Sequence, residues 1–162
     1  MILGTFVAVM MAAGGGSADA LSSVTVKTIA LKAPAAWTRS NVEGSEKFLA
    51  PSGDAYFLVD VGTVQTAGMK AELCRTKILA NIGGDGWTML KVGGQPAATK
   101  TDTDAAPDGS GNVDTVTYVG CNGKTTWSVV FYMEQGKKDR FSAVAEKVGT
   151  SVSFTPPKNK KG

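Results

Sequence analysis

The segment Thr126–Met133 constrains the fold more than any other part of the sequence. Apolar side chains alternate along it so that both faces of a β-strand at this position would be largely apolar. One face would carry Trp127, Val129, Phe131 and Met133, and the other Ser128, Val130 and Tyr132. Such a strand is central in a sheet and is covered on each side. Because an Asn-Gly turn joins it to a second predicted strand at Val113–Gly120, the two segments are expected to form a β-hairpin.

Two segments have the spacing of apolar residues that is typical of amphipathic helices. The first is predicted from Ala67 to Ile82, with Thr66 as its N-cap and Gly83-Gly84 as its end. Its inward face is expected to carry Ala67, Ala71, Cys74, Ile78 and Ile82. The second helix is predicted over about Lys138 to Gly149, with an inward stripe of Phe141, Val144, Ala145 and Val148.

Other segments rich in β-branched and aromatic residues lie between turns of Gly, Asp and Asn, which predicts further strands. These are Val24–Leu31, paired with Phe48-Leu49, followed by Ala55–Val61, Trp87–Val92 and Ala97–Asp102. Strands and helices then alternate in the order β-β-β-α-β-β-β-β-α. The hairpins in the middle of this order predict an α+β fold, with a mostly antiparallel sheet covered by helices.

The first twenty residues are typical of a secretory signal peptide, because an apolar run is followed by the small-residue cleavage signal Ala18-Asp19-Ala20. A retained membrane anchor is the alternative, although the run is shorter than the ~20 apolar residues of a transmembrane helix. We therefore expect a signal peptide at 1–20, a single domain at 21–155 and a basic flexible tail at 156–162. The mature protein would be exported to the periplasm or the extracellular space, with no stable membrane span.

The sequence contains two cysteines, Cys74 and Cys121. An oxidising compartment outside the cytosol favours a disulfide between them. Two free cysteines packed in the core are the alternative. A disulfide here would fasten the first predicted helix to the sheet.

Several short motifs occur in an order that resembles the Mog1/PsbP/DcrB-like group. They include a P-x-x-W segment, an apolar residue and proline before a strand, a Trp-bearing strand, a G-G-x-P-A turn and a final S-V pair. Here they stand at Pro34 to Trp37, Phe48 to Pro51, Trp87, Gly93 to Ala97 and Ser151-Val152. The match spans Val24 to Phe154. The resemblance implies an α/β/α sandwich and a non-enzymatic role, since members bind a protein partner, assist assembly of a larger complex or act as small adaptors.

The chain contains no histidine, which removes the commonest general base, the usual zinc ligand and every Ser-His or Cys-His dyad. Paired carboxylates are the remaining catalytic option, with Asp54, Asp60, Glu43 and Glu46 as candidates. Carboxylates at this density are ordinary on a protein surface. We therefore expect a protein that is not an enzyme and uses no cofactor.

The segment 101–114 is the one candidate for metal binding. Asp102, Asp104, Asp108 and Asp114, together with Ser110 and Asn112, supply the oxygen ligands that calcium prefers. Their spacing does not match an EF-hand, because Ala106 takes the fifth position from Asp102 and no bidentate glutamate follows. We expect no bound metal, with calcium as the weaker alternative.

The sequence has a net charge of +3, and much of the basic excess lies in the C-terminal tail. Lys and Arg are not interleaved with aromatic residues as in a nucleic-acid interface, so no nucleic-acid partner is expected. Trp37 and the nearby Arg39 would be an anchor for a partner protein if Trp37 is exposed. If Trp37 is buried, it is a core residue like most large aromatics.

These features lead to one main hypothesis about function. The protein is expected to be an exported, non-enzymatic binding or assembly factor of the bacterial cell envelope, whose partner is another envelope protein or a multi-subunit complex. One alternative is a carrier of a small apolar ligand, with a cavity lined by the apolar face of Trp127 to Met133. The other is an enzyme with an unrecognised carboxylate site.

Overall fold

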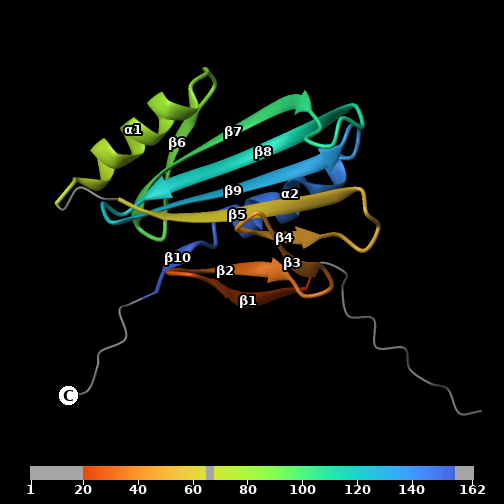
Figure 1. Cartoon of the computed structure of the whole chain (residues 1–162), viewed down its shortest axis with the longest axis horizontal. Coiled ribbons are helices and arrows are strands. Elements are labelled where there is room, and N and C mark those ends of the chain that lie inside the picture. Colours follow the sequence, from red (N-terminus) through yellow and green to blue (C-terminus); the bar gives the residue numbers. More distant parts are fainter. Residues whose placement is uncertain (1–19, 65–67, 156–162) are drawn as a thin grey trace, which may run out of the picture.

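The structure is a computed structural model that describes residues 20–64 and 68–155. A seven-stranded antiparallel sheet forms its centre (Figure 1), with the strand order β3-β4-β5-β9-β8-β7-β6. These strands are β3 (Thr38–Val42), β4 (Ser45–Leu49), β5 (Ala55–Thr63), β6 (Thr88–Val92), β7 (Gln95–Ala105), β8 (Asn112–Cys121) and β9 (Thr125–Glu134). A small sheet has the order β1-β2-β10, with β1 (Leu21–Val26), β2 (Ile29–Pro34) and β10 (Ser153–Phe154). The predicted α+β fold with a mostly antiparallel sheet is confirmed.

The β8–β9 hairpin forms around the predicted Asn-Gly turn. The Asn122 side-chain oxygen accepts hydrogen bonds from the backbone N–H groups of Lys124 and Thr125, at 2.9 and 2.8 Å. Gly123 has a φ of +92°, a left-handed conformation that glycine adopts without strain. Strand β9 lies between β5 and β8 in the middle of the large sheet, as predicted from its two apolar faces.

One face of the large sheet packs against α2 (Lys138–Gly149) and the small sheet. The core on this side is aromatic, and Trp37 lies within it at ring-centroid distances of 5.6 Å from Phe57, 6.4 Å from Phe131 and 6.0 Å from Phe141. Phe57 and Phe131 stack on each other across β5 and β9, and both are fully buried. Helix α2 contributes the predicted stripe of Phe141, Val144, Ala145 and Val148.

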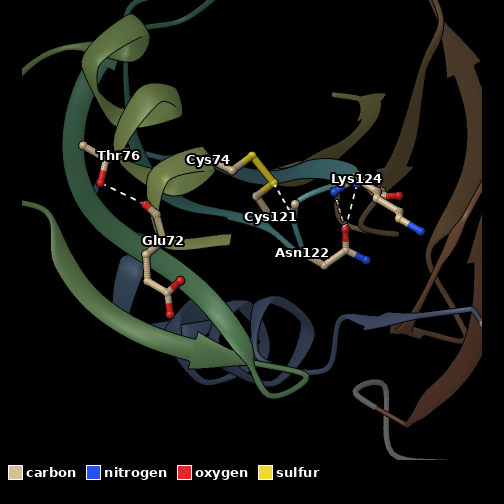
Figure 2. Close-up of a disulfide and its surroundings, with 8 residues drawn as sticks. Glu72, Cys74, Thr76, Cys121, Asn122 and Lys124 are labelled. Carbon is tan, nitrogen blue, oxygen red and sulfur yellow. Dashed lines mark hydrogen bonds between the residues drawn. A yellow bond between two sulfur atoms is a disulfide. The ribbon is translucent and has the colours of Figure 1, made fainter. Parts of the chain in front are cut away.

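Helix α1 (Ala71–Ile82) lies on the opposite face, over β7 and β8 (Figure 1). The disulfide between Cys74 and Cys121 joins it to the end of β8, with a Cα–Cα distance of 6.0 Å (Figure 2). Cys74 is the one buried residue of α1. Ile82, which was predicted to face inward, is 53% exposed, so this helix packs much less tightly than α2.

The first helix begins later than predicted. It starts at Ala71, because Gly68 has a φ of +79° and Lys70 is extended, with a ψ of 140°. The helix has no side-chain N-cap hydrogen bond, and the predicted cap Thr66 and first residue Ala67 lie outside the described residues. Its end is as predicted, since Gly83 has a φ of +74° and its N–H donates to the Leu79 carbonyl.

The N-terminal strands differ from the prediction. The segment Val24–Leu31 is not one strand but the middle of a hairpin, in which β1 and β2 turn at Lys27, with a φ of +51°. Strand β2 pairs with β1 and β10, whereas Phe48-Leu49 belongs to β4 and pairs with β3 and β5. Strands β3 and β10 were not predicted, because β3 is exposed and polar and β10 has only two residues.

The signal peptide and the basic tail predicted at 1–20 and 156–162 lie outside the described residues, apart from Ala20. Strand β1 begins at Leu21, and the Ala20 carbonyl accepts a hydrogen bond from the N–H of Ala35. Among the helices in the described part of the chain, none has the length and apolar character needed to cross a membrane.

Candidate functional site: an open face of the large sheet

The large sheet leaves part of one face uncovered. The register places Tyr56, Leu58 and Asp60 of β5 on this face, beside Tyr132, Val130 and Ser128 of β9. Strands β8 and β7 extend it with Thr115, Thr117, Lys100, Asp102 and Asp104, and β4 adds Lys47. Most of these side chains are half-buried or exposed, because α1 covers only the β7 and β8 end of the sheet. We call this set of residues the open face; its exposure corrects the prediction that β9 is covered on both sides.

Two stacked tyrosines lie at the centre of the open face. The rings of Tyr56 and Tyr132 face each other across β5 and β9, with centroids 4.8 Å apart and planes 16° apart. The ammonium nitrogen of Lys47 lies 4.3 Å from the centroid of the Tyr56 ring, which is a cation–π contact. Next to Tyr132 on β8, Thr115 is buried and donates a hydrogen bond of 3.0 Å to Asp104.

Open hollows lie on both sides of the tyrosine pair. On the α1 side, one of about 350 Å³ is lined by Asp60, Ile78, Ile82 and Val119, and one of about 270 Å³ by Trp87, Lys100, Asp102 and Asp104. On the other side, the loop at 106–111 borders two more, of about 270 and 420 Å³, both of which include Tyr56 and Asp108. The open face is therefore a shallow surface with raised edges rather than a single deep pocket.

The hollows are rich in carboxylates. Their linings contain seven acidic side chains, namely Glu43, Asp54, Asp60, Asp102, Asp104, Asp108 and Glu134. They contain two basic side chains, Lys47 and Lys100. The linings thus carry a charge of −5, from two positive and seven negative groups, in a sequence whose net charge is +3.

The pKa shifts favour the ionised form of Asp102 and Asp108 and the neutral form of the two tyrosines. The hydrogen bond from Lys100 lowers the pKa of Asp102, and hydrogen bonds from Ser110 lower that of Asp108. Burial raises the pKa of both Tyr56 and Tyr132 above 10.0. Asp104 and Asp60 raise the pKa of Tyr132 further, because a negative charge nearby disfavours the phenolate.

Trp37 and Arg39, the predicted partner-binding residues, do not form an exposed pair. Trp37 is 7% exposed and fills the core between Phe57 and Phe141, so it cannot anchor a partner at the surface. Arg39 is exposed, but its guanidinium forms an ion pair of 2.7 Å with Glu46 and donates to the Thr25 carbonyl of β1. Both residues stabilise the junction between the two sheets.

The four aspartates of the calcium alternative do not converge. Asp102 forms an ion pair of 2.7 Å with Lys100, and Asp108 accepts hydrogen bonds within its own loop. Asp114 lies on the other face of the sheet from Asp104, since it pairs with Thr103, and accepts from that threonine. Within residues 20–64 and 68–155, no three acidic, histidine or cysteine side chains are grouped so as to hold a metal ion.

The four catalytic candidates are also separate. Asp54 is bound by Arg140 and Ser52, and Glu46 by Arg39 and Asn41. Asp60 lies on the open face and accepts a hydrogen bond from Ser45, while Glu43 is in the β3–β4 turn. No two of these four are joined in the arrangement that carboxylate catalysis requires.

The cavity expected for an apolar ligand carrier is filled. Val129 and Phe131, from the apolar face of β9, are 0% exposed and pack against side chains of the large sheet and α2. The apolar hollow beneath α1 is on the opposite side of the sheet and is lined by Ile78, Ile82 and Val119. Trp87, the first residue of the strand predicted at Trp87–Val92, is half-buried and lines the hollow beside Lys100.

The architecture is that of an α+β protein with the Mog1/PsbP-like fold, and similar solved structures agree with this. Cyanobacterial PsbP (CyanoP) from Synechocystis sp. PCC 6803 has a TM-score of 0.60 and 13% identity, over 90% of this chain and 98% of that one. LpqN, described as involved in cell envelope biogenesis of Mycobacterium tuberculosis, has a TM-score of 0.53 and 13% identity, over 85% and 91% of the two chains.

A third similar structure comes from Bacteroides thetaiotaomicron VPI-5482, with a TM-score of 0.63 and 15% identity. The match covers 83% of this chain but 47% of that one, so the chain spans about half the length of the Bacteroides protein. No protein-family model and no curated protein matches the sequence. At these identities the similarity shows the fold, and function has to be argued from the open face.

Proposed function

We propose that the protein is a non-enzymatic accessory factor of the bacterial cell envelope that binds a partner protein through the open face. The observation that carries this proposal is the uncovered tyrosine pair at the centre of a sheet whose other face is fully packed. Exposed aromatic side chains on a rigid scaffold are frequent anchors of protein interfaces. The resemblance to the Mog1/PsbP group and the envelope role described for LpqN support the same class of function.

An exported location is part of the proposal. The disulfide between Cys74 and Cys121 supports it, because such bonds persist in oxidising compartments. The leader expected at 1–20 supports it as well, and β1 begins at Leu21, directly after the expected cleavage site. N-terminal sequencing of the native protein would test this, and an intact Met1 would contradict it.

Site-specific photo-crosslinking in the native host tests the binding function. We would place a photoreactive amino acid at Leu58 or Thr117 on the open face, and at Lys32 or Lys147 on the other side of the molecule as controls. We expect the same stoichiometric partner to be captured from both open-face positions and from neither control. Capture that is equal at all four positions, or absent at all four, would reject the proposal.

A carrier of a small apolar ligand is a second candidate, favoured by the hollow of about 350 Å³ beneath α1. Ile78, Ile82 and Val119 give it apolar walls, and the hollow is open to solvent. Native mass spectrometry of protein purified from its host would show a bound lipid or other apolar molecule. A spectrum containing only the mass of the free protein would remove this candidate.

A further inference from the structure

We propose that the occupant of the open face is a cationic segment of the partner, with an arginine or lysine side chain seated on the Tyr56–Tyr132 pair. This inference rests on the proposed function and specifies the chemistry of its partner. Three features of the surface support it: its charge, the contact that the tyrosines already make, and the carboxylates around them.

Ion pairs within the described residues do not neutralise the charge of the hollow linings around the open face. Of the seven carboxylates in the hollow linings, ion pairs engage Asp54, through Arg140, and Asp102, through Lys100. The other five are Glu43, Asp60, Asp104, Asp108 and Glu134, and along residues 20–64 and 68–155 they have no ion-pair partner within 4.0 Å. A cationic partner would supply the missing charges, whereas an anionic surface would be repelled.

The tyrosine pair already interacts with a cation. Lys47 lies over the Tyr56 ring within the same chain, at 4.3 Å from its centroid. Lys47, from β4, covers one face of the Tyr56 ring, and Tyr132, from β9, covers the other, so Tyr132 is the ring of the pair that a cation of the partner would contact. Arginine would suit the pair better still, since its planar guanidinium stacks on aromatic rings and is weakly hydrated.

Two unpaired carboxylates lie near Tyr132. Asp60 and Asp104 are both close enough to raise the pKa of its phenol. Asp104 is held by the buried Thr115, which donates to it at 3.0 Å, and Asp60 by Ser45 at 2.5 Å. A cation placed against Tyr132 would therefore interact with both carboxylates as well as with the aromatic ring.

A hexaarginine amide is a direct probe of this site. We would titrate it into the ¹⁵N-labelled, disulfide-bonded protein in about 20 mM salt and follow backbone amide shifts by NMR. We expect the changes to cluster on β5, β8 and β9 around Tyr56, Thr117 and Tyr132. We expect them to weaken in 150 mM salt, because exposed ion pairs are screened.

Matched variants identify the groups responsible. The double variant Asp60→Asn/Asp104→Asn should weaken binding about fivefold, the effect of losing two exposed ion pairs. The control Asp139→Asn/Glu146→Gln removes two charges from exposed positions on α2 and should keep the original affinity. Tyr132→Leu should weaken binding about threefold by removing the aromatic face, while Tyr132→Phe keeps the ring and should bind as before.

Several results would overturn the inference. They are absence of binding, shifts spread over all acidic surfaces, and equal affinity of the open-face and control double variants. A hexaglutamate peptide or anionic lipid vesicles that bind the same residues would also overturn it. If crosslinking from Leu58 and Thr117 still captures one partner, the proposed function survives that failure; if crosslinking fails as well, both are rejected.

Discussion

The three tyrosines of the chain lie in two different surroundings. Tyr118 is 6% exposed and packs against α2, where Gly149 approaches its ring so closely that a Cβ would collide with it. Tyr56 and Tyr132 are half-buried on the open face. Burial is nevertheless the main cause of a raised pKa in all three, so each phenol stays neutral in the folded protein beyond its ordinary value of 10.0.

Raised phenol pKa values predict a loss of stability at alkaline pH. Below pH 10, both the folded and the unfolded protein keep the phenols protonated, so the tyrosines contribute fully to the free energy of unfolding. This contribution is lost as the pH rises through the higher pKa of the folded state, because the unfolded chain ionises first. We expect the free energy of unfolding, measured in urea, to fall above pH 10, and tyrosinate absorbance to have a higher midpoint in the native protein than in denaturant. Tyr118→Phe should make that fall less steep.

Replacement of Trp37 tests whether this side chain belongs to the core rather than to a partner interface. Its ring fills the space between Phe57, Phe131 and Phe141, so Trp37→Ala should leave a cavity and cost about 3–5 kcal/mol of unfolding free energy. Trp37→Phe should cost less, since most of the aromatic volume is kept. Binding of hexaarginine by the folded fraction should not change in either variant. A stable Trp37→Ala protein that no longer binds the partner would restore Trp37 as an interface residue.

At the scale of elements, the sequence predicted helices and strands most accurately where a segment carried one strong local signal. The β8–β9 hairpin followed from its Asn-Gly turn, and α2 followed from an unbroken apolar stripe. The β1–β2 hairpin was missed because its turn at Lys27 contains no glycine, proline or asparagine, so the strands on either side read as one. The start of α1 was predicted too early because Ala67 and Met69 continue the helical pattern of the sequence. In the structure, Gly68 and Lys70 do not have helical backbone angles.

The two helices differ in what holds them to the sheet. Helix α2 buries five residues, whereas α1 buries one, and that one is the disulfide-bonded Cys74. Leu73 and Ile82 of α1 are about half exposed. The position of α1, and with it one edge of the open face, depends mainly on a covalent bond.

Loss of the disulfide should therefore affect α1 more than the rest of the protein. In Cys74→Ala/Cys121→Ala, we expect hydrogen exchange to show nearly complete loss of amide protection in α1, while α2 loses only the protection that corresponds to the lower global stability. Closure of a 47-residue loop predicts a global loss of about 4 kcal/mol by the chain-entropy model. A reducing agent should act on the original protein in the same way and leave the double variant unchanged. Full protection of α1 in that variant would contradict this account.

At the scale of the whole molecule, both sheets share one core. Ile29 and Leu31 of the small sheet belong to the same buried cluster as Phe57 and Phe131 of the large sheet. Arg39 adds a polar link, since it extends from β3 to the Thr25 carbonyl of β1. The small sheet is thus a cover for the core of the large one, and we expect neither to be stable alone.

A shared core predicts a single unfolding transition. Ile29 is 0% exposed, so Ile29→Ala should cost about 2–5 kcal/mol. The loss should shift the urea midpoints of tryptophan fluorescence and of far-ultraviolet circular dichroism by equal amounts. As a control, Lys32→Ala, at an exposed position of the same strand, should leave both midpoints nearly unchanged. Separate midpoints for the two signals would show that the small sheet unfolds independently.

The candidate site could be predicted only in part. Alternation along β5 places Tyr56, Leu58 and Asp60 on one face, and that much follows from the sequence. Tyr132 lies opposite Tyr56 because β5 pairs with β9, and these two strands are separated by more than sixty residues of chain. That the face is uncovered depends on where α1 packs. Neither the pairing of the two tyrosines nor the uncovered face has a local sequence signal. The sequence therefore pointed to Trp37 as the candidate partner-binding residue instead.

The bond between Cys74 and Cys121 also has a mechanical consequence. It closes α1, β6, β7 and β8 into a covalent ring, so a force applied to the two ends of the chain bypasses these elements. At about 3.3–3.6 Å per residue, the segment from Cys74 to Cys121, with a sequence separation of 47, holds back about 150 Å of extension until the bond is reduced. Stretching a single oxidised molecule would pull apart β1–β5, β9 and α2, while β6, β7 and β8 of the central sheet stayed within a closed covalent loop that the force does not extend.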